Sequence, residues 1–460
     1  MSAAYPPIIC ALVLAGYVTG KEFFFNLPVI LLASLAFFTC DSIKPFIVLF
    51  CTFIFQVSAE HTPQWPVCSD YYFTEWRLPI LIALAALLLA SMISFIVRTK
   101  LFSKIGVGKT PMLIPMLLLC VGFLLNGVMS ETWNVHGFAY GIYNSVVFLV
   151  GFIFVYHGFS DEDSASELGK YFAYVSALVA LVLIGQLADL NINDGLLVDG
   201  VLDRTKFFFG WGVTNTVGVS LAVLIPVIMY GAYKNRCGAL YFIIATLTYV
   251  CVPFTLSRNA LLASTAVYVI CVLIFCLFGR KRSEFRFYTV CCVLVFGAIM
   301  ILAWSKIYPV FEDFFNRGIG DSGRFDIWRQ AYEIFLKNPV FGAGFNGLPN
   351  LDGAEIVEPA FFMPWMAHNT VFQLLCGMGI VGFAVYVIYR ISSLRPFVVK
   401  PNLLKAMLFL SIGVLLAESL LDNFIFYITP TFHYTVSLAI AFKAANEEKR
   451  ELPVKYERRW

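Results

Sequence analysis

Charged side chains are scarce in this sequence, and their scarcity excludes an ordinary soluble protein. Only 13% of the 460 residues carry charge, while 60% are apolar; soluble domains carry about a quarter charged residues. Apolar runs close to the length of a bilayer crossing recur from Pro6 to Phe442. Lipid must cover most of these side chains, so the sequence predicts an all-α polytopic membrane protein.

A cysteine framework is also missing. Ten of the twelve cysteines lie inside apolar runs, where a thiol behaves as a small hydrophobe. Cys237 lies in a short loop, and Cys68 is the one cysteine of a longer hydrophilic loop. The spacing therefore predicts neither a disulfide scaffold nor a zinc site.

The apolar runs predict about fourteen transmembrane helices. When every second connection is assigned to one side, Lys and Arg gather there, and the positive-inside rule identifies that side as the cytoplasm. Both termini are then cytoplasmic, and 309–367 is the one long extracytoplasmic loop. The predicted spans are 6–20, 22–40, 44–58, 77–97, 111–129, 141–158, 170–188, 211–233, 238–256, 259–278, 288–308, 368–390, 403–421 and 424–442.

These spans predict three parts of the chain. Residues 1–200 hold the N-terminal transmembrane helices, and 201–442 hold the transmembrane region that carries the candidate site, including loop 309–367. Residues 443–460 form a basic cytoplasmic tail.

Inside the long loop, Gly323–Asn338 is predicted to form an amphipathic helix that ends at Pro339. Arg324 then lies in the first turn, where free N–H groups and the helix dipole favour an anion. The aromatic face is expected to rest on the membrane surface or on the helix bundle. Its aromatic residues are Phe325, Trp328, Tyr332 and Phe335.

Two segments imitate known motifs without their context. Gly106–Thr110 looks like the end of a phosphate-binding loop, but Ser103 stands where that motif needs glycine, and no strand precedes it. Asp161–Asp163 resembles a metal-binding acidic pair, yet it lies in a short cytoplasmic connection. We interpret it as a solvated acidic turn.

The few cations on the extracytoplasmic face are the first functional candidates. A lone arginine there is more often an interfacial anchor, and a lone histidine is often a polar cap. Together they favour a reaction with a phosphate leaving group, because guanidinium binds phosphate bidentately and histidine exchanges protons near neutral pH. The candidate segments are Asp203–Lys206, Ser257–Asn259, Arg324 and Ala367–Thr370.

The C-terminal half, roughly 200–390, resembles the bacterial O-antigen ligase/O-antigen polymerase family. One position departs from the family pattern: Thr214-Asn215 stands where the family often has Pro-Asn. The segments that carry the resemblance are Ser322–Trp328, Asn338–Gly344, His368–Gln373 with Gly379 and Gly382, and Ser257-Arg258.

The resemblance implies a GT-C-like helix bundle and a metal-independent glycosyltransferase that needs no cofactor. Its donor would be a glycan on undecaprenyl diphosphate. Arg204 and Arg258 would bind the diphosphate, and His368 would remove the proton of the acceptor hydroxyl. The expected substrate-binding residues are Arg324, Trp328, Asn369, Lys206 and Trp365, and Tyr332 is a further stacking candidate.

The resemblance leaves two acceptors open. A polymerase transfers the glycan to the next lipid-linked repeat, whereas a ligase transfers it to lipid A-core. About fourteen spans favour a polymerase of surface polysaccharide (O-antigen, capsule or exopolysaccharide), because ligases of this family tend to be shorter. The site would face the periplasmic side of the bacterial inner membrane. Besides donor and acceptor, the expected partners are membrane lipids and a chain-length regulator, with no nucleic acid.

A polysaccharide or solute transporter is the alternative from another class. Glu418, Asp422 and His433 lie within or near the last two predicted spans, where ionisable groups often mark ion pathways. A transporter is expected to show an internal repeat, and none is apparent. The cations also gather at one face instead of the midplane, so enzyme chemistry is preferred, and the role of these three residues stays open.

Overall fold

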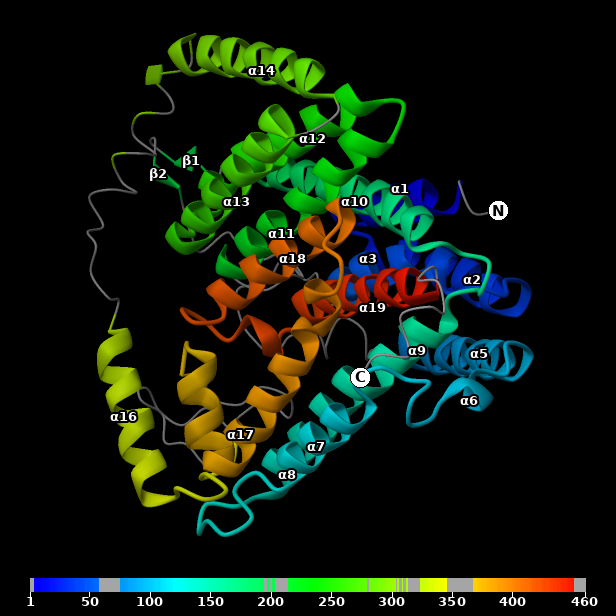
Figure 1. Ribbon diagram of the computed structural model, residues 1–460, viewed down its shortest axis with the longest axis vertical. Coiled ribbons are helices and arrows are strands. Elements are labelled where there is room, and N and C mark those ends of the chain that lie inside the picture. Colours follow the sequence, from blue (N-terminus) through cyan, green and yellow to red (C-terminus); the bar gives the residue numbers. More distant parts are fainter. Residues whose placement is uncertain are drawn as a thin grey trace, which may run out of the picture. The chain divides into compact units, whose positions relative to one another are not determined.

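The computed structural model is built almost entirely of helices (Figure 1). The only strands in its described part are β1 (Leu197–Val198) and β2 (Val201–Leu202), which pair antiparallel. The structure describes residues 4–57, 75–193, 197–198, 201–202, 214–278, 281–302, 304–305, 308, 312, 323–345 and 367–450.

The predicted membrane architecture is confirmed in its coarse form. Each of the fourteen predicted spans falls on a described helix. Nine helices of the described residues are long and apolar enough to cross a bilayer, and two shorter apolar helices, Tyr5–Thr19 and Leu113–Leu124, accompany them. The number fourteen itself stays a prediction.

One compact unit comprises Met1–Lys100, Phe159–Ile319 and Met407–Val414. Its most buried helix is α11, which packs against α10, α12 and α13 because its side chains are apolar nearly all round. Its helices are α1 (Tyr5–Thr19), α2 (Glu22–Thr39), η1 (Lys44–Phe46), α3 (Ile47–Val57), α5 (Arg77–Arg98), α10 (Ala165–Asn193), α11 (Thr214–Lys234), α12 (Gly238–Cys251), η4 (Val252–Thr255), α13 (Arg258–Leu277) and α14 (Arg282–Leu302).

The second unit comprises Leu101–Gly158, Gly320–Ala406 and Leu415–Trp460. Here α17 packs against α7, α16 and α19, and α16 lies beside α17 (Figure 1). Its helices are α6 (Leu101–Lys104), α7 (Leu113–Leu124), α8 (Val135–Ser145), η2 (Val146–Val150), α9 (Gly151–Gly158), α16 (Arg324–Lys337), α17 (Thr370–Val398), η5 (Phe424–Phe426), α19 (Ile428–Arg450) and the ends of α18 (Leu403–Glu418).

Helix α17 is broken at Gly379, whose backbone (φ 65°, ψ −166°) is open only to glycine. The segment after α16 supplies replacement hydrogen bonds at the break. Ala343 N donates to Cys376 O at 2.7 Å, and Ile380 N donates to Pro339 O at 2.8 Å. A membrane helix tolerates such a break only where another part of the protein satisfies its backbone groups.

The predicted amphipathic helix forms as α16, one residue shorter at each end than expected. Its most buried residue is Ala331, which is not one of the aromatic residues. Ala331 is fully buried against α17 with Ile334 beside it, whereas Phe325 and Tyr332 are exposed by 65% and 48%. The small side chain of Ala331 allows α16 to approach α17 closely, so the aromatic stripe divides between two faces.

Helix α19 continues to Arg450, beyond the predicted end of the last span at 442. Lys405 Nζ pairs with Glu448 Oε2 at 2.7 Å, and Asn402 Nδ2 donates to Glu448 Oε1 at 2.6 Å. These contacts tie the last turns of α19 to the start of α18. Of the predicted tail, residues 443–450 are helix and residues 451–460 lie outside the described residues.

The two imitation motifs have structural partners. Asp163 pairs with Lys44 at 3.4 Å and accepts a hydrogen bond from Ser42 at 2.7 Å. Thr110 Oγ1 lies 2.8 Å from His157 Nε2 in the turn before α7. Within the described residues, no group of three or more His, Cys, Asp or Glu side chains is arranged to hold a metal ion.

Candidate functional site

His368 and Asp422 form the core of the candidate site. His368 Nδ1 lies 3.1 Å from Asp422 Oδ1. The Asp422 side chain is only 3% exposed, whereas that of His368 is 42% exposed. A buried carboxylate thus holds one nitrogen of an imidazole ring that is itself partly exposed.

The pKa of the Asp422 carboxyl follows from its surroundings. Asp422 lies in the connection between α18 and α19, where burial raises the pKa of its carboxyl. The hydrogen bond and charge of His368, with the hydrogen bond from Asn423 N, outweigh burial and hold that pKa below its ordinary value. An ionised carboxylate only accepts hydrogen bonds, so His368 Nδ1 is the donor in this contact; in the neutral ring of that tautomer, Nε2 carries the lone pair.

Backbone hydrogen bonds fix the segment around His368 against the segment around Asp422. Thr370 N donates to Ser419 O at 2.9 Å, and Asn369 Nδ2 donates to Leu420 O at 2.6 Å. His368 itself has φ 47°, a left-handed conformation that is uncommon outside glycine. Such a conformation persists where the surrounding structure over-determines it, as these contacts do.

Gln373 connects the segment around His368 with the segment around Asp422. Its side-chain oxygen accepts hydrogen bonds from Ala367 N at 2.7 Å and from Asn423 Nδ2 at 2.9 Å. Gln373 and Asn423 are both about 1% exposed. Because an unpaired buried donor costs about 1–3 kcal/mol, this amide strongly favours the observed arrangement.

Asn369, a predicted substrate contact, caps helix α17. Its Oδ1 accepts hydrogen bonds from Val371 N at 2.8 Å and Phe372 N at 3.2 Å. Its Nδ2 is used by Leu420 O. The amide is engaged at both ends, which favours a positioning role beside His368 over contact with a substrate.

Arg324 begins α16 and belongs to the same electrostatic environment. Its charge contributes to the lowered pKa of the Asp422 carboxyl. Glu418, one helical turn before Asp422, is 2% exposed, and its Oε2 has no hydrogen-bond partner among the described residues. A cation, two acids and the imidazole therefore occupy one neighbourhood of this unit.

Trp328, the predicted sugar platform, already stacks on a protein ring. Its centroid lies 5.7 Å from that of Phe372, with an interplanar angle of 20°. One face of the indole is thus covered. Tyr332, 48% exposed on α16, presents more free ring surface to a sugar than Trp328 does.

Arg258 lies in the first compact unit, at the first residue of α13. Ser257 caps this helix by accepting a hydrogen bond from Ala260 N at 3.4 Å. The turn packs tightly on α11, because a Cβ on Gly218 would lie 2.7 Å from that of Ala260. Arg258 is therefore held about one turn from the start of α11, the helix that follows Arg204 in the sequence.

Three predicted site residues, Arg204, Lys206 and Trp365, lie outside the described residues. The structure places His368, Asn369, Arg324 and Trp328 in one compact unit. The predicted convergence of all the cations with His368 on one face stays a prediction.

Comparison with known families supplies the deciding observation. The family described as O-antigen ligase matches residues 239–387, about a third of the chain. This match supports the resemblance of the C-terminal half to the O-antigen ligase/polymerase family. The matched region includes Arg258, Arg324 and His368, while Asp422 lies beyond it. No curated protein matches the chain.

The sequence prediction for this O-antigen ligase domain did not assign Asp422, Asn423 or Glu418 to the site. A signal existed, because the predicted alternation of spans puts the end of 403–421 on the same face as the start of 368–390. Two acids at that end, opposite a histidine at the neighbouring end, indicate an acid–imidazole contact.

Proposed function

We propose that the chain transfers a glycan from an undecaprenyl-diphosphate carrier to a sugar hydroxyl of an acceptor, as a polymerase of bacterial surface polysaccharide. The observation that carries the proposal is the His368–Asp422 contact inside and beside the matched O-antigen ligase region. It holds one imidazole nitrogen against a buried carboxylate and leaves the ring partly exposed, an arrangement that suits a general base.

The reaction needs one proton transfer and one displacement. His368 Nε2 removes the proton of the acceptor hydroxyl while that oxygen attacks the anomeric carbon of the donor. The bond from that carbon to the diphosphate oxygen breaks, and the configuration at carbon inverts. Asp422 stabilises the imidazolium that forms, since its carboxylate accepts the hydrogen bond from Nδ1.

Arginine side chains stabilise the leaving diphosphate. Arg258 and Arg204 are proposed to bind its oxygens, and Arg324 supplies further positive charge near the imidazole. Lys206 and Trp365 stay proposed substrate contacts. Because guanidinium groups carry fixed charge, we propose that the reaction proceeds without a metal ion.

The matched family description favours one alternative acceptor, the lipid A-core of an O-antigen ligase. The two functions share donor, base and leaving group and differ only in the hydroxyl that attacks. A purified chain offered both acceptors distinguishes them directly.

The test uses proteoliposomes with the lipid-linked glycan donor, without nucleotide sugar, and with each acceptor in turn. We expect longer lipid-linked glycan with the wild type and a loss of at least about a hundredfold in Arg258→Ala. Arg236→Ala, an exposed arginine of a predicted cytoplasmic connection, is the matched control. Unchanged elongation by Arg258→Ala would remove Arg258 from the site, and transfer to lipid A-core alone would replace polymerase by ligase.

A further inference from the structure

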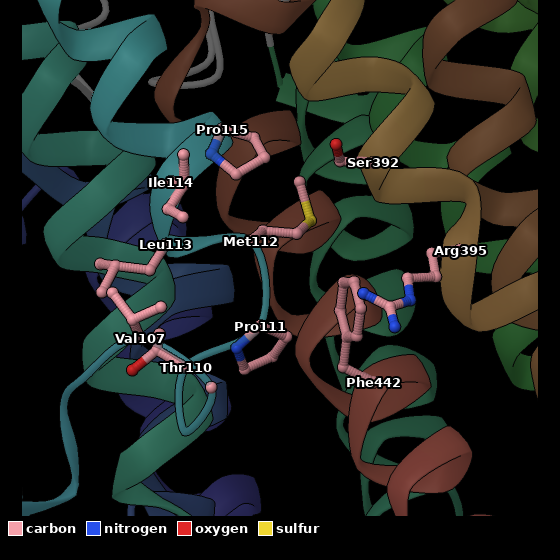
Figure 2. A pocket seen from close by; sticks show the side chains of 11 residues that line it. Val107, Thr110, Pro111, Met112, Leu113, Ile114, Pro115, Ser392, Arg395 and Phe442 are labelled. Carbon is pink, nitrogen blue, oxygen red and sulfur yellow. The ribbon is translucent and has the colours of Figure 1, made fainter.

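A cavity of about 230 Å³ lies in the second unit, at the end of α17 away from His368 (Figure 2). The turn before α7 and the first turn of that helix form one wall, and the last two turns of α17 and Phe442 of α19 form the other. Its lining includes Thr110, Met112, Ile114, Ser392, Arg395 and Phe442. None of the described residues of the candidate glycosyltransferase site contributes to it.

Arg395 gives the cavity its charge. Among the described residues of the lining, it is the only charged side chain, and none of them is a carboxylate. Figure 2 shows its guanidinium directed from α17 toward the Phe442 ring of α19. Within the part of the chain that the structure describes, no ion pair involves Arg395. The cavity therefore offers a cation to an anionic group from outside the described protein.

The wall opposite Arg395 is built before any ligand binds. Thr110 Oγ1 contacts His157 Nε2 at 2.8 Å and accepts a hydrogen bond from Gly106 N at 3.3 Å. Thr110 N donates to Gly106 O at 2.9 Å, and Met112 holds φ 63°. A wall fixed by its own hydrogen bonds needs little ordering when a ligand enters.

Apart from the hydroxyls of Thr110 and Ser392, the other side chains of the lining are apolar, which decides between two sources of an anion. Met112, Ile114 and Phe442 offer no hydrogen bonds, so they suit methylene groups better than a hydrated free ion. Ile114 is 53% exposed, so part of the apolar lining is accessible from outside the protein. Arg395 also lies at the predicted cytoplasmic end of α17, where anionic lipids concentrate.

We propose that this cavity binds the phosphate headgroup of an anionic phospholipid of the cytoplasmic leaflet. Arg395 binds the phosphate oxygens, and Met112, Ile114 and Phe442 contact the glycerol and first methylenes. The proposal is independent of the glycan-transfer site, because it rests on different residues at the other end of α17.

The test is native mass spectrometry of the full chain, purified in detergent and titrated with phosphatidylglycerol, phosphatidylcholine or inorganic phosphate. We expect one tightly retained phosphatidylglycerol, weakened at least about tenfold in Arg395→Gln and in Ile114→Trp, which fills the cavity without changing charge. Arg236→Gln, the same substitution at an exposed arginine outside the cavity, keeps wild-type binding.

Three results would overturn the proposal. The first is equal retention of phosphatidylglycerol by wild type, Arg395→Gln and Ile114→Trp. The second is equal retention of phosphatidylcholine by the wild type, and the third is inorganic phosphate that competes as strongly as the lipid. Thermal unfolding of each variant in phosphatidylcholine nanodiscs verifies that it is folded.

Discussion

Asp422→Asn removes one charge from the candidate site and little volume. In the wild type, His368 Nδ1 donates to a carboxylate that is 3% exposed. A hydrogen bond to a charged group contributes about 1.5–3 kcal/mol, and each 1.4 kcal/mol corresponds to about a factor of ten in rate. Since the bond strengthens as His368 becomes imidazolium, we expect kcat to fall about 10- to 100-fold, with KM within about twofold of wild type.

The assay is glycan transfer in proteoliposomes under donor saturation, with thermal unfolding measured on the same preparations. Glu333→Gln is the matched control, because that carboxylate lies on α16, is 57% exposed and pairs with Arg329 instead of histidine. A folded Asp422→Asn protein with wild-type kcat would refute the assignment of Asp422 as the residue that orients the base.

Three further predictions concern the scaffold. Gly379→Ala should lower the free energy of unfolding by at least about 1–3 kcal/mol, because φ is 65° and the new Cβ would lie 2.3 Å from Val340 O. Gly413→Ala, which has open space around the new Cβ, should unfold like wild type. Equal unfolding of the two variants would contradict this prediction. Gln373→Leu should lower both the melting temperature and the transfer rate, because it leaves Ala367 N and Asn423 Nδ2 without their hydrogen-bond acceptor. Gln330→Leu on α16 is the control and should change neither. A Gln373→Leu protein as stable as wild type would count against the buried amide contacts. Folding lowers the pKa of the Asp422 carboxyl, so its ionisation stabilises the fold above the unfolded carboxyl pKa of about 3.9, and this contribution is lost as the pH falls through the lower folded pKa. Between about pH 5 and about pH 2, the melting temperature should therefore fall more steeply for wild type than for Asp422→Asn. Parallel curves for the two proteins would disprove this prediction.

Local pattern was sufficient to predict the helices. Every predicted span falls on a helix, because membrane helices are determined by apolar length alone. Gly323–Asn338 was likewise predictable from its spacing. Its packing on α17 was not, because the cluster of Ala331 with Cys376 depends on residues of α17 and not on the spacing within Gly323–Asn338.

The break in α17 and the acid beside His368 depend on distant residues. In the sequence, nothing distinguishes Gly379 from other glycines of membrane helices. Its break depends on Pro339 and Val340, whose carbonyl groups accept hydrogen bonds from the residues after it. Asp422 is 54 positions from His368, and no periodicity relates two such positions. The sequence predicted the imidazole from its family motif, but only the fold shows which carboxylate orients it.

The central claim is that His368 is the base of a glycan transfer that consumes only a lipid-linked donor. The measurement is the initial rate of undecaprenyl diphosphate release, with acceptor present and nucleotide sugar absent, for wild type, His368→Ala and the control His136→Ala on α8. We expect His368→Ala to lose about 100- to 10,000-fold in rate while His136→Ala matches wild type. Release at the wild-type rate by folded His368→Ala would contradict the claim.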